Sequence, residues 1–211
     1  MAEPMNRQTR NAARMPKQKR GLQTRKKIMT AGERLFVKHG FHQVPVESIA
    51  EAAGVSVGSF YAYFNDKREL FLALVDQLLG RISARLTDSI GAITDAPGLT
   101  VRDFIKQAVQ VIFNAHNTAP GMLRETSRMA MLDDAVQSRL DEVDAPVQAT
   151  IADALKSKLG WNQKGAMTAA FVIYHAVEGV IHRLVLNPGE MDENAAAVEL
   201  TAMLTAYIEN R

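Results

Sequence analysis

The sequence predicts an all-α fold, with a small three-helix head at the N-terminus and a larger helical bundle as the body, about nine helices in total. Two observations lead to this prediction. Apolar residues recur every three or four positions along most of the 211 residues. Residues that end helices, such as Gly40, Gly160 and Pro188, stand at the ends of these periodic stretches. With 47% hydrophobic residues, the chain can also bury a sizeable core.

The positive charge of the chain is concentrated at its N-terminus. Residues 1–27 contain nine Lys or Arg and one acid, a net charge of +8, so the rest of the chain carries −6 for the total of +2. Residues 1–21 lack apolar periodicity, which predicts a disordered basic arm rather than a secretory signal. A basic arm is typical of proteins that bind the phosphate backbone of DNA, although a solubilising tail has the same composition.

The first helix is expected from about Thr24, as its N-cap, to His39. Arg25, Lys26 and Lys27 then lie in the first turn, where each cation opposes the helix dipole at a cost of about 0.3–1 kcal/mol at low salt. A DNA phosphate at this helix end would offset that cost. Arg25 and Lys26 are therefore candidate DNA contacts.

Residues 49–64 have the pattern of a helix-turn-helix. Gly54 can take the positive φ that ends the first short helix, and Ser56 can cap the second. The second helix of such a motif enters the DNA major groove. Its expected exposed face consists of small and hydroxyl-bearing residues, namely Val57, Gly58, Ser59, Tyr61, Ala62 and Tyr63. An ordinary αα-corner also uses Gly and Ala, but the basic residues nearby favour DNA binding.

A combined pattern in residues 23–79 is more specific than the bare motif. It comprises Ala31, Leu35, Phe36, Gly40 and Phe41, then Ile49, Ala50, Ala53, Gly54, Val55, Ser56, Gly58, Ser59, Phe60, Tyr61, Tyr63 and Phe64, and then Lys67, Leu70 and Phe71. This segment resembles the DNA-binding region of the TetR family of bacterial transcriptional regulators. The rest of the chain resembles the family only in its length and helical character.

The resemblance implies a homodimer that binds a palindromic operator in double-stranded DNA, usually as a repressor that a small ligand releases. It assigns phosphate contacts to Ser56, Tyr61, Tyr63 and Lys67, and base contacts to Val57, Gly58 and Ser59, with Tyr61 and Ala62 as further candidates. These assignments divide the head, residues 22–68, from a body for ligand binding and dimerisation, residues 69–211.

Two residues, Pro45 and Tyr63, depart from the family pattern, and Val57 limits the hydrogen bonding of the recognition helix. Pro45 stands where the family often has a Thr or Ser cap, so this position offers no hydroxyl to a phosphate. Tyr63 replaces the commoner His and donates without a charge. Val57 has little hydrogen-bonding capacity at an expected base-reading position, where it could contact a thymine methyl group.

The body is expected to contain a long helix from residue 67 to about 90, a loop over residues 91–98, and helices that start near Thr100, Gly121, Asp133, Asn162 and Asp192. Pro146 predicts a kink or break near Asp144. The absence of Cys fits a reducing cytoplasm. No apolar stretch approaches the roughly 20 residues of a membrane span, so no membrane partner is expected.

An effector pocket is expected between the body helices, and the identity of the effector cannot be read from the sequence beyond a hydrophobic character. The candidate pocket residues are Phe104, Phe113, His116, Met122, Met129, Phe171 and Tyr174. Ordinary core packing is the alternative for the apolar and aromatic ones, and a solvated or paired surface position is the alternative for His116.

The resemblance to the family implies a dimer interface on the last two helices, whose apolar faces are wide enough to serve both the core and a partner subunit. The candidate interface residues are Ile173, Val177, Gly179, Val180, Leu184, Leu200, Met203, Leu204 and Tyr207. A helix pair packed only within one chain is the alternative.

His175, Glu178 and His182 share one helical face, but two His seven residues apart are about 10 Å apart along the axis, too far for one metal without a partner chain. A polar seam at the dimer interface or at the pocket wall is the expected role of this face. No metal or cofactor is therefore expected. No catalytic constellation is recognisable either, so the chain is expected not to be an enzyme. Two other functions remain open: a DNA-binding dimer controlled without a small ligand, and an all-helical enzyme or carrier with a vestigial head.

Overall fold

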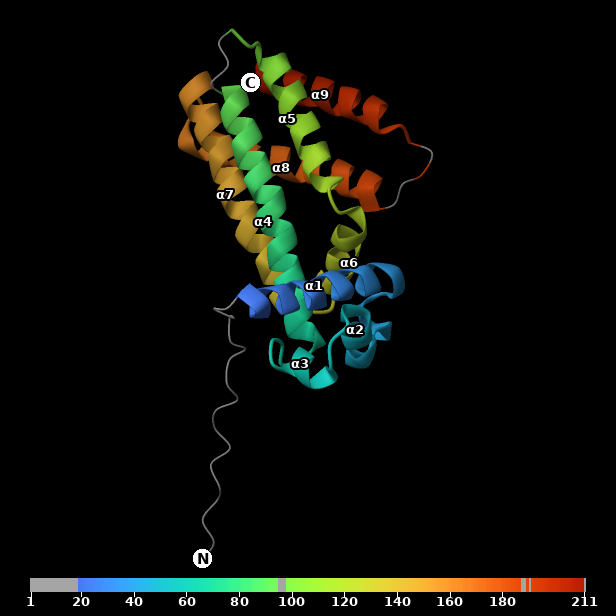
Figure 1. The fold of residues 1–211 in the computed structure, drawn as a ribbon. Helices are drawn as coiled ribbons and strands as arrows, with labels where there is room; N and C mark the ends of the chain where they lie inside the picture. The colour runs from blue at the N-terminus through green and yellow to red at the C-terminus, as the bar shows by residue number, and fades with distance from the viewer. Residues whose placement is uncertain (1–18, 95–97, 187–188, 190, 211) are drawn as a thin grey trace, which may run out of the picture. The chain divides into compact units, whose positions relative to one another are not determined.

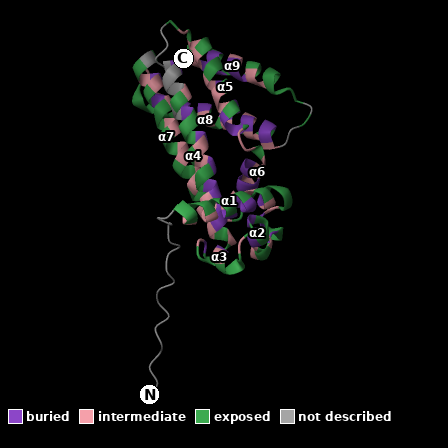
Figure 2. Ribbon diagram, in the orientation of Figure 1, coloured by how far each residue is buried: buried purple, intermediate pink, exposed green. Residues whose placement is uncertain are grey.

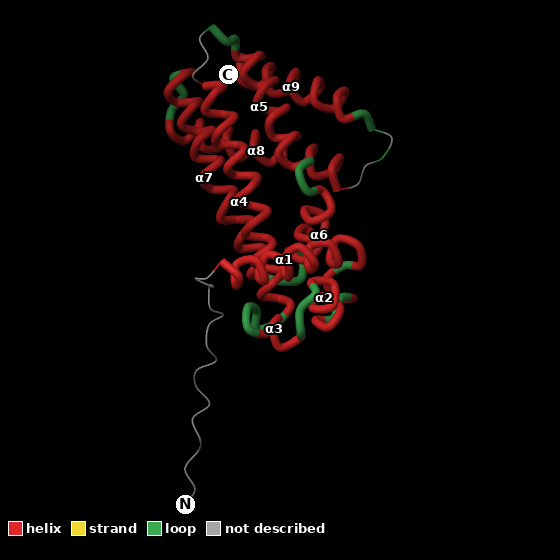
Figure 3. The backbone as a smooth tube through the Cα atoms, viewed as in Figure 1, coloured by secondary structure: helices red, strands yellow, loops and turns green. Residues whose placement is uncertain are grey.

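The computed structural model describes residues 19–94, 98–186, 189 and 191–210 (Figure 1). These residues form helices joined by loops and contain no strand (Figure 3), which confirms the predicted all-α class. The helices are α1 (Lys19–His39), the 3-10 helix η1 (Phe41–Gln43), α2 (Val46–Ala53), α3 (Val57–Tyr61), α4 (Lys67–Thr94), α5 (Val101–His116), α6 (Pro120–Ala130), α7 (Asp134–Leu159), α8 (Gln163–Leu186) and α9 (Glu193–Glu209).

The chain divides into two compact units, and the boundary lies inside α4, between Leu74 and Val75. The sequence placed the boundary after residue 68. One helix therefore supplies residues to both the head and the body. The prediction of a disordered arm concerns residues 1–21, of which residues 1–18 lie outside the described part of the chain.

The first helix starts earlier than the sequence predicted. It begins at Lys19, and the hydroxyl of Thr24 donates to the carbonyl oxygen of Arg20 at 3.1 Å, so Thr24 lies inside the helix and is not its N-cap. Arg25 and Lys26 consequently lie beyond the first turn of α1. The dipole effect falls off within the first turn, so the electrostatic reason given above for a phosphate at these two residues is wrong.

Aromatic rings fill the core of the head. The ring centroids of Phe36, Phe41 and Phe71 lie 5.2–5.7 Å apart in tilted and edge-to-face pairs, geometries that such rings favour. Gly32 lets α1 approach the start of α4, because a Cβ atom at this position would lie 2.7 Å from Cδ2 of Leu70. This packing holds α2 and α3 on a rigid base.

The body is a bundle in which α8 is central. It packs against α5, α6, α7 and α9, and α5 also packs against α9; buried positions recur along these helices (Figure 2). The predicted helix starts at Thr100, Asp133 and Asp192 are confirmed. Each of these side chains accepts a hydrogen bond from a backbone N–H in the first turn of the helix that follows.

Two boundaries in the body differ from expectation. α4 continues to Thr94, through the start of the predicted loop, and α7 continues through Pro146 without a break. Pro146 is exposed, so water can satisfy the carbonyl group that the missing proline N–H leaves without a partner.

By length and composition, α8 could cross a membrane, with a mean hydropathy of 1.4 over its most apolar window. No such stretch was expected from the sequence. Within the body, 44% of that window is buried, and α8 packs against four other helices. Burial in the bundle accounts for part of the apolar composition of α8, since Met167, Phe171 and Val172 are exposed.

Candidate DNA interface and a polar cluster in the body

The turn between α2 and α3 has the predicted geometry. Gly54 has a φ of 65°, in the left-handed region that favours glycine, and the N–H groups of Gly54 and Val55 bond to carbonyl oxygens at the end of α2. Ser56 caps α3, because its Oγ accepts from the N–H of Ser59 at 3.1 Å. These bonds fix the direction in which α3 leaves the turn.

One face of α3 is buried and the other is open. Phe60 and, just after the helix, Phe64 are buried in the head. The candidate DNA-contacting residues of α3 and its flanks are exposed or half-buried: Ser56, Val57, Gly58, Ser59, Tyr61, Ala62 and Tyr63. Tyr61 is 51% exposed, with its ring packed edge-to-face on Phe60. The open face therefore consists of small side chains and hydroxyl groups, as the sequence predicted.

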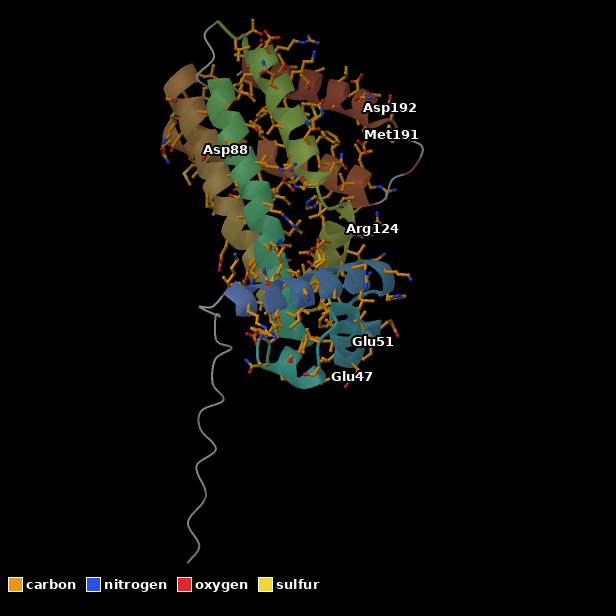
Figure 4. All side chains as sticks on the ribbon, in the orientation of Figure 1. Glu47, Glu51, Asp88, Arg124, Met191 and Asp192 are labelled. Atoms are coloured by element: carbon orange, nitrogen blue, oxygen red, sulfur yellow. The ribbon has the colours of Figure 1, made fainter. Side chains whose placement is uncertain are left out.

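Neither helix of the motif contains a cation. α2 carries Glu47 and Glu51, both exposed (Figure 4), and α3 has no charged residue. The positive charge that attracts a phosphate backbone must therefore come from α1, from the residues before α1, or from the start of α4.

Lys67, at the start of α4, has a structural role that the sequence did not indicate. Its ammonium group donates to three backbone carbonyl oxygens, those of Phe41, His42 and Val44, at 3.0, 3.2 and 3.1 Å. It also lies 4.8 Å from the centre of the Phe41 ring. All three donors of the ammonium have acceptors within the head, so a phosphate contact by Lys67 would have to share them.

The two candidate DNA contacts on α1, Arg25 and Lys26, differ in their surroundings. The guanidinium of Arg25 lies 5.0 Å from the centre of the Phe64 ring, and its Nη1 lies 3.0 Å from the sulfur of Met29. Lys26 is exposed. Arg25 is therefore held beside the end of the helix-turn-helix, and contacts of both residues with phosphate stay predictions.

The predicted pocket residues do not gather around a described cavity. Phe113, His116, Met122 and Met129 are buried in the body, Phe104 and Tyr174 are half-buried, and Phe171 is 55% exposed. A partly open hollow of about 280 Å³ lies between α4 and α5, lined by Arg85, Ser89, Val111, Asn114 and Ala115. None of the seven candidates lines it.

Most of the predicted interface residues face inward. Ile173, Val177, Leu184, Leu200 and Leu204 are buried within the single chain, Val180 and Tyr207 are half-buried, and only Gly179 and Met203 are exposed. The five buried residues pack the chain's own core, and their contact with a partner subunit stays a prediction.

The exposed apolar residues of α8 and α9 are largely different ones. They are Met167, Phe171 and Val172 on α8, and Val198 and Met203 on α9. On α8, the sequence signal that would have identified this exposed face is a second apolar stripe, four residues apart at positions 167 and 171.

The body contains a cluster of three titratable side chains from two helices. The Nε2 atoms of His116 on α5 and of His182 on α8 lie 3.3 and 3.0 Å from the same carboxylate oxygen of Glu178. The imidazole rings are edge-to-face, with centroids 5.3 Å apart. The sequence had grouped Glu178 and His182 with His175, and the packing of α5 on α8 puts His116 there instead.

The charges in this cluster stabilise one another. Burial by itself would raise the pKa of Glu178, but the hydrogen bonds from His116 and His182 outweigh burial and lower its pKa to about 2. Burial would lower the pKa of His116, but the bond and the negative charge of Glu178 raise it. The carboxylate is thus ionised, and a positive charge is favoured beside it.

A second polar pair lies close by. The hydroxyl of Tyr174 on α8 donates to a carboxylate oxygen of Asp144 on α7. Burial, together with the negative charges of Glu178 and Asp144, raises the pKa of Tyr174 above its usual range, so the hydroxyl keeps its proton. Burial also raises the pKa of Asp144, against the opposing effect of the Tyr174 hydrogen bond.

Both compact units of the chain match known proteins of one family. Residues 28–74 match the family described as bacterial regulatory proteins, tetR family, and residues 100–208 match the tetracyclin repressor-like C-terminal domain. The chain is 27% identical over 177 residues to the HTH-type transcriptional regulator TtgR of Pseudomonas putida, covering 81% of this chain and 84% of TtgR. It is 24% identical over 179 residues to the HTH-type transcriptional repressor AcnR of Corynebacterium glutamicum, covering 76% and 93%.

Solved structures share the fold. A TetR-like transcriptional regulator from Rhodococcus sp. RHA1 superposes with a TM-score of 0.62 at 24% identity, covering 94% of this chain and 100% of that one. The fatty acid degradation regulator FadR from Bacillus halodurans superposes with a TM-score of 0.65 at 22% identity, covering 86% and 94%. Because the matched regions include the helix-turn-helix and most of the body, the chain belongs to the TetR family of DNA-binding transcriptional regulators.

Proposed function

We propose that this chain acts in the cytoplasm as a homodimeric repressor, which binds a palindromic operator in double-stranded DNA and is released by a small hydrophobic effector. The observation that carries the proposal is the open face of α3, where small and hydroxyl-bearing side chains stand on a helix whose direction is fixed by the Gly54 turn and the Ser56 cap. The start of this face can approach base edges closely, because Val57, Gly58 and Ser59 have small side chains.

The exposed groups of α3 and its flanks divide into candidates for phosphate contacts and candidates for base contacts. The hydroxyls of Ser56, Tyr61 and Tyr63 are donors for phosphate oxygens, and Val57, Gly58 and Ser59 are at the end of α3 that would meet base edges. The hydroxyl of Ser56 is only 2.8 Å from that of Ser59, so a contact by one of them orients the other.

The dimer is supported by the apolar residues that the single chain leaves exposed. Met167, Phe171 and Val172 on α8 and Val198 and Met203 on α9 belong to helices that pack against each other. Exposed apolar residues grouped in this way are typical of protein–protein interfaces. Gly179 is exposed on α8 as well and would let a partner helix approach closely.

Two observations bear on the effector. The hollow between α4 and α5 is formed by a helix that also belongs to the head, so a ligand there could change the geometry of DNA binding, typically by about 1–3 kcal/mol of coupling. The burial of Phe113, Met122 and Met129 in a packed core instead favours the second candidate function, a DNA-binding dimer controlled without a small ligand.

The test is a titration of the purified protein against DNA from upstream of its own gene, with random DNA of equal length as the control, at two salt concentrations. We expect selective binding by two subunits per site, with recognition helices about one DNA turn, or 34 Å, apart. Equal and weak binding to both DNAs would contradict the proposed operator.

A thermal-shift screen of small hydrophobic molecules then separates the two forms of control. A ligand that raises the melting temperature and also weakens operator binding supports an effector. Ligands that change neither quantity favour control by abundance or by a protein partner. Turnover of a substrate, without salt-sensitive DNA affinity, would favour the enzyme or carrier alternative.

A further inference from the structure

We propose that His116, Glu178 and His182 form a binding site for a divalent transition-metal ion, with Zn²⁺ as the best fit, that connects α5 to α8 in the body. This inference goes beyond the proposed function, since neither DNA binding nor a hydrophobic effector needs the site.

The donor set fits the metal. Two imidazole nitrogens and one carboxylate oxygen are the protein ligands of a three-ligand zinc site that keeps a fourth position open. The three potential ligand atoms all lie within 4.8 Å of one another. The two nitrogen-to-oxygen distances, 3.3 and 3.0 Å, are close to the separation of about 3.3–3.5 Å between ligands around a tetrahedral Zn²⁺.

The tautomer of His116 is already the one that a metal ligand requires. Its Nδ1 lies 2.8 Å from the carbonyl oxygen of Ile112, and since a carbonyl only accepts, Nδ1 carries the hydrogen. Metal-bound histidines typically donate a hydrogen bond from the ring nitrogen that does not bind the metal. This bond orients the ring and directs the lone pair of the other nitrogen, here Nε2, at the metal.

The centre of the cluster requires positive charge. In the neutral form of His116, Nε2 and the Glu178 oxygen are both acceptors, and two acceptors at 3.3 Å need a proton or a cation between them. A metal ion between the two atoms meets this requirement, because neutral imidazole and ionised carboxylate are the forms that bind metals.

Burial leaves an entry path on one side. His116 is 5% exposed, whereas His182 is 34% exposed, so an ion can enter past His182 and the fourth position can face solvent. Asp144, which accepts a hydrogen bond from Tyr174, adds a second carboxylate near Glu178, which further favours a cation there over an anion. His175, on the same helix, is exposed and contacts the rings of Phe171 and Tyr174.

The experiment is calorimetric titration of ZnCl₂ into the full-length protein after treatment with EDTA and exchange into metal-free buffer. We expect one Zn²⁺ per subunit. His182→Ala, which changes the more exposed ligand, should weaken binding by at least about 10–100-fold, since loss of even an outer partner of a metal ligand has that effect. Glu178→Gln should weaken it similarly, and the matched control His175→Ala should bind as the unchanged protein does.

Two further measurements make the result decisive. Co²⁺ in place of Zn²⁺ should develop the visible absorption of a four-coordinate ion, whereas MgCl₂ should produce no heat, because Mg²⁺ prefers oxygen ligands. Circular dichroism checks that each variant is folded. Absence of saturable Zn²⁺ uptake, or equal uptake by the unchanged protein and His182→Ala, would overturn the proposal. Neither result depends on DNA binding, so the proposed function is tested separately.

Discussion

The ammonium nitrogen of Lys67 lies 3.1 Å from the carbonyl oxygen of Val44, twenty-three residues earlier in the chain. With the bonds to Phe41 and His42, this contact holds the end of the 3-10 helix η1, where the Phe41 carbonyl oxygen also accepts from the N–H of Val44. One side chain thus attaches the segment before α2 to the start of α4. The orientation of the helix-turn-helix depends on that attachment.

Replacing Lys67 by Met should destabilise the protein by about 1–3 kcal/mol, because three carbonyl groups then have no charged donor. The measurement is the urea midpoint of the full-length protein, with Lys27→Met, an exposed cation on α1, as the control. An unchanged midpoint would contradict the structural role. If the salt slope of DNA binding also falls by about 0.9, Lys67 contacts a phosphate as well.

Replacing Tyr61 by Phe keeps the ring on Phe60 and removes only an exposed hydroxyl. If that hydroxyl donates to a phosphate, affinity should fall roughly 10-fold for operator and random DNA alike, which corresponds to about 1.4 kcal/mol. Fluorescence anisotropy with both DNAs measures this, with Ser138→Ala on the exposed surface of α7 as the control. A reduction confined to operator DNA would assign Tyr61 to base reading instead.

Removing residues 1–18 takes away Arg7, Arg10, Arg14 and Lys17 while leaving α1, which begins at Lys19, complete. The slope of log affinity against log salt should become shallower by up to about 3.6, or about 0.9 for each phosphate that these side chains neutralise. A full-length variant with Gln at the same four positions should behave alike. An unchanged slope in both proteins would mean that the arm does not contact DNA.

Phe171→Glu should weaken the proposed dimer, because the exposed apolar side chain would become a charge buried between subunits. We expect the dissociation constant of the dimer to rise by at least about 30-fold, equivalent to about 2 kcal/mol. Sedimentation velocity over a dilution series measures it. Met131→Glu is the matched control, since Met131 is 86% exposed at the end of α6 and belongs to neither α8 nor α9. Equal dimerisation of both variants would exclude this face.

The elements that the sequence predicted well are those determined by local geometry. The positive φ of Gly54 and the caps at Ser56, Thr100 and Asp133 each depend on a few neighbouring residues. The start of α1 was predicted wrongly because a Thr can be an N-cap or, as Thr24 is, an interior residue bonded to the preceding turn. The break predicted near Asp144 was also wrong. Pro146 is tolerated inside α7, because its position is exposed.

The sequence by itself determined the all-α class, the helix-turn-helix and the residues on the open face of α3, since helical periodicity and turn chemistry are local properties of the chain. Tertiary packing decided the rest. It brought Lys67 to the carbonyl groups of residues 41–44, and His116 to Glu178 and His182. It also decided which apolar side of α8 is core and which is exposed. These contacts join residues far apart in sequence, and periodicity along one helix contains no information about its neighbours.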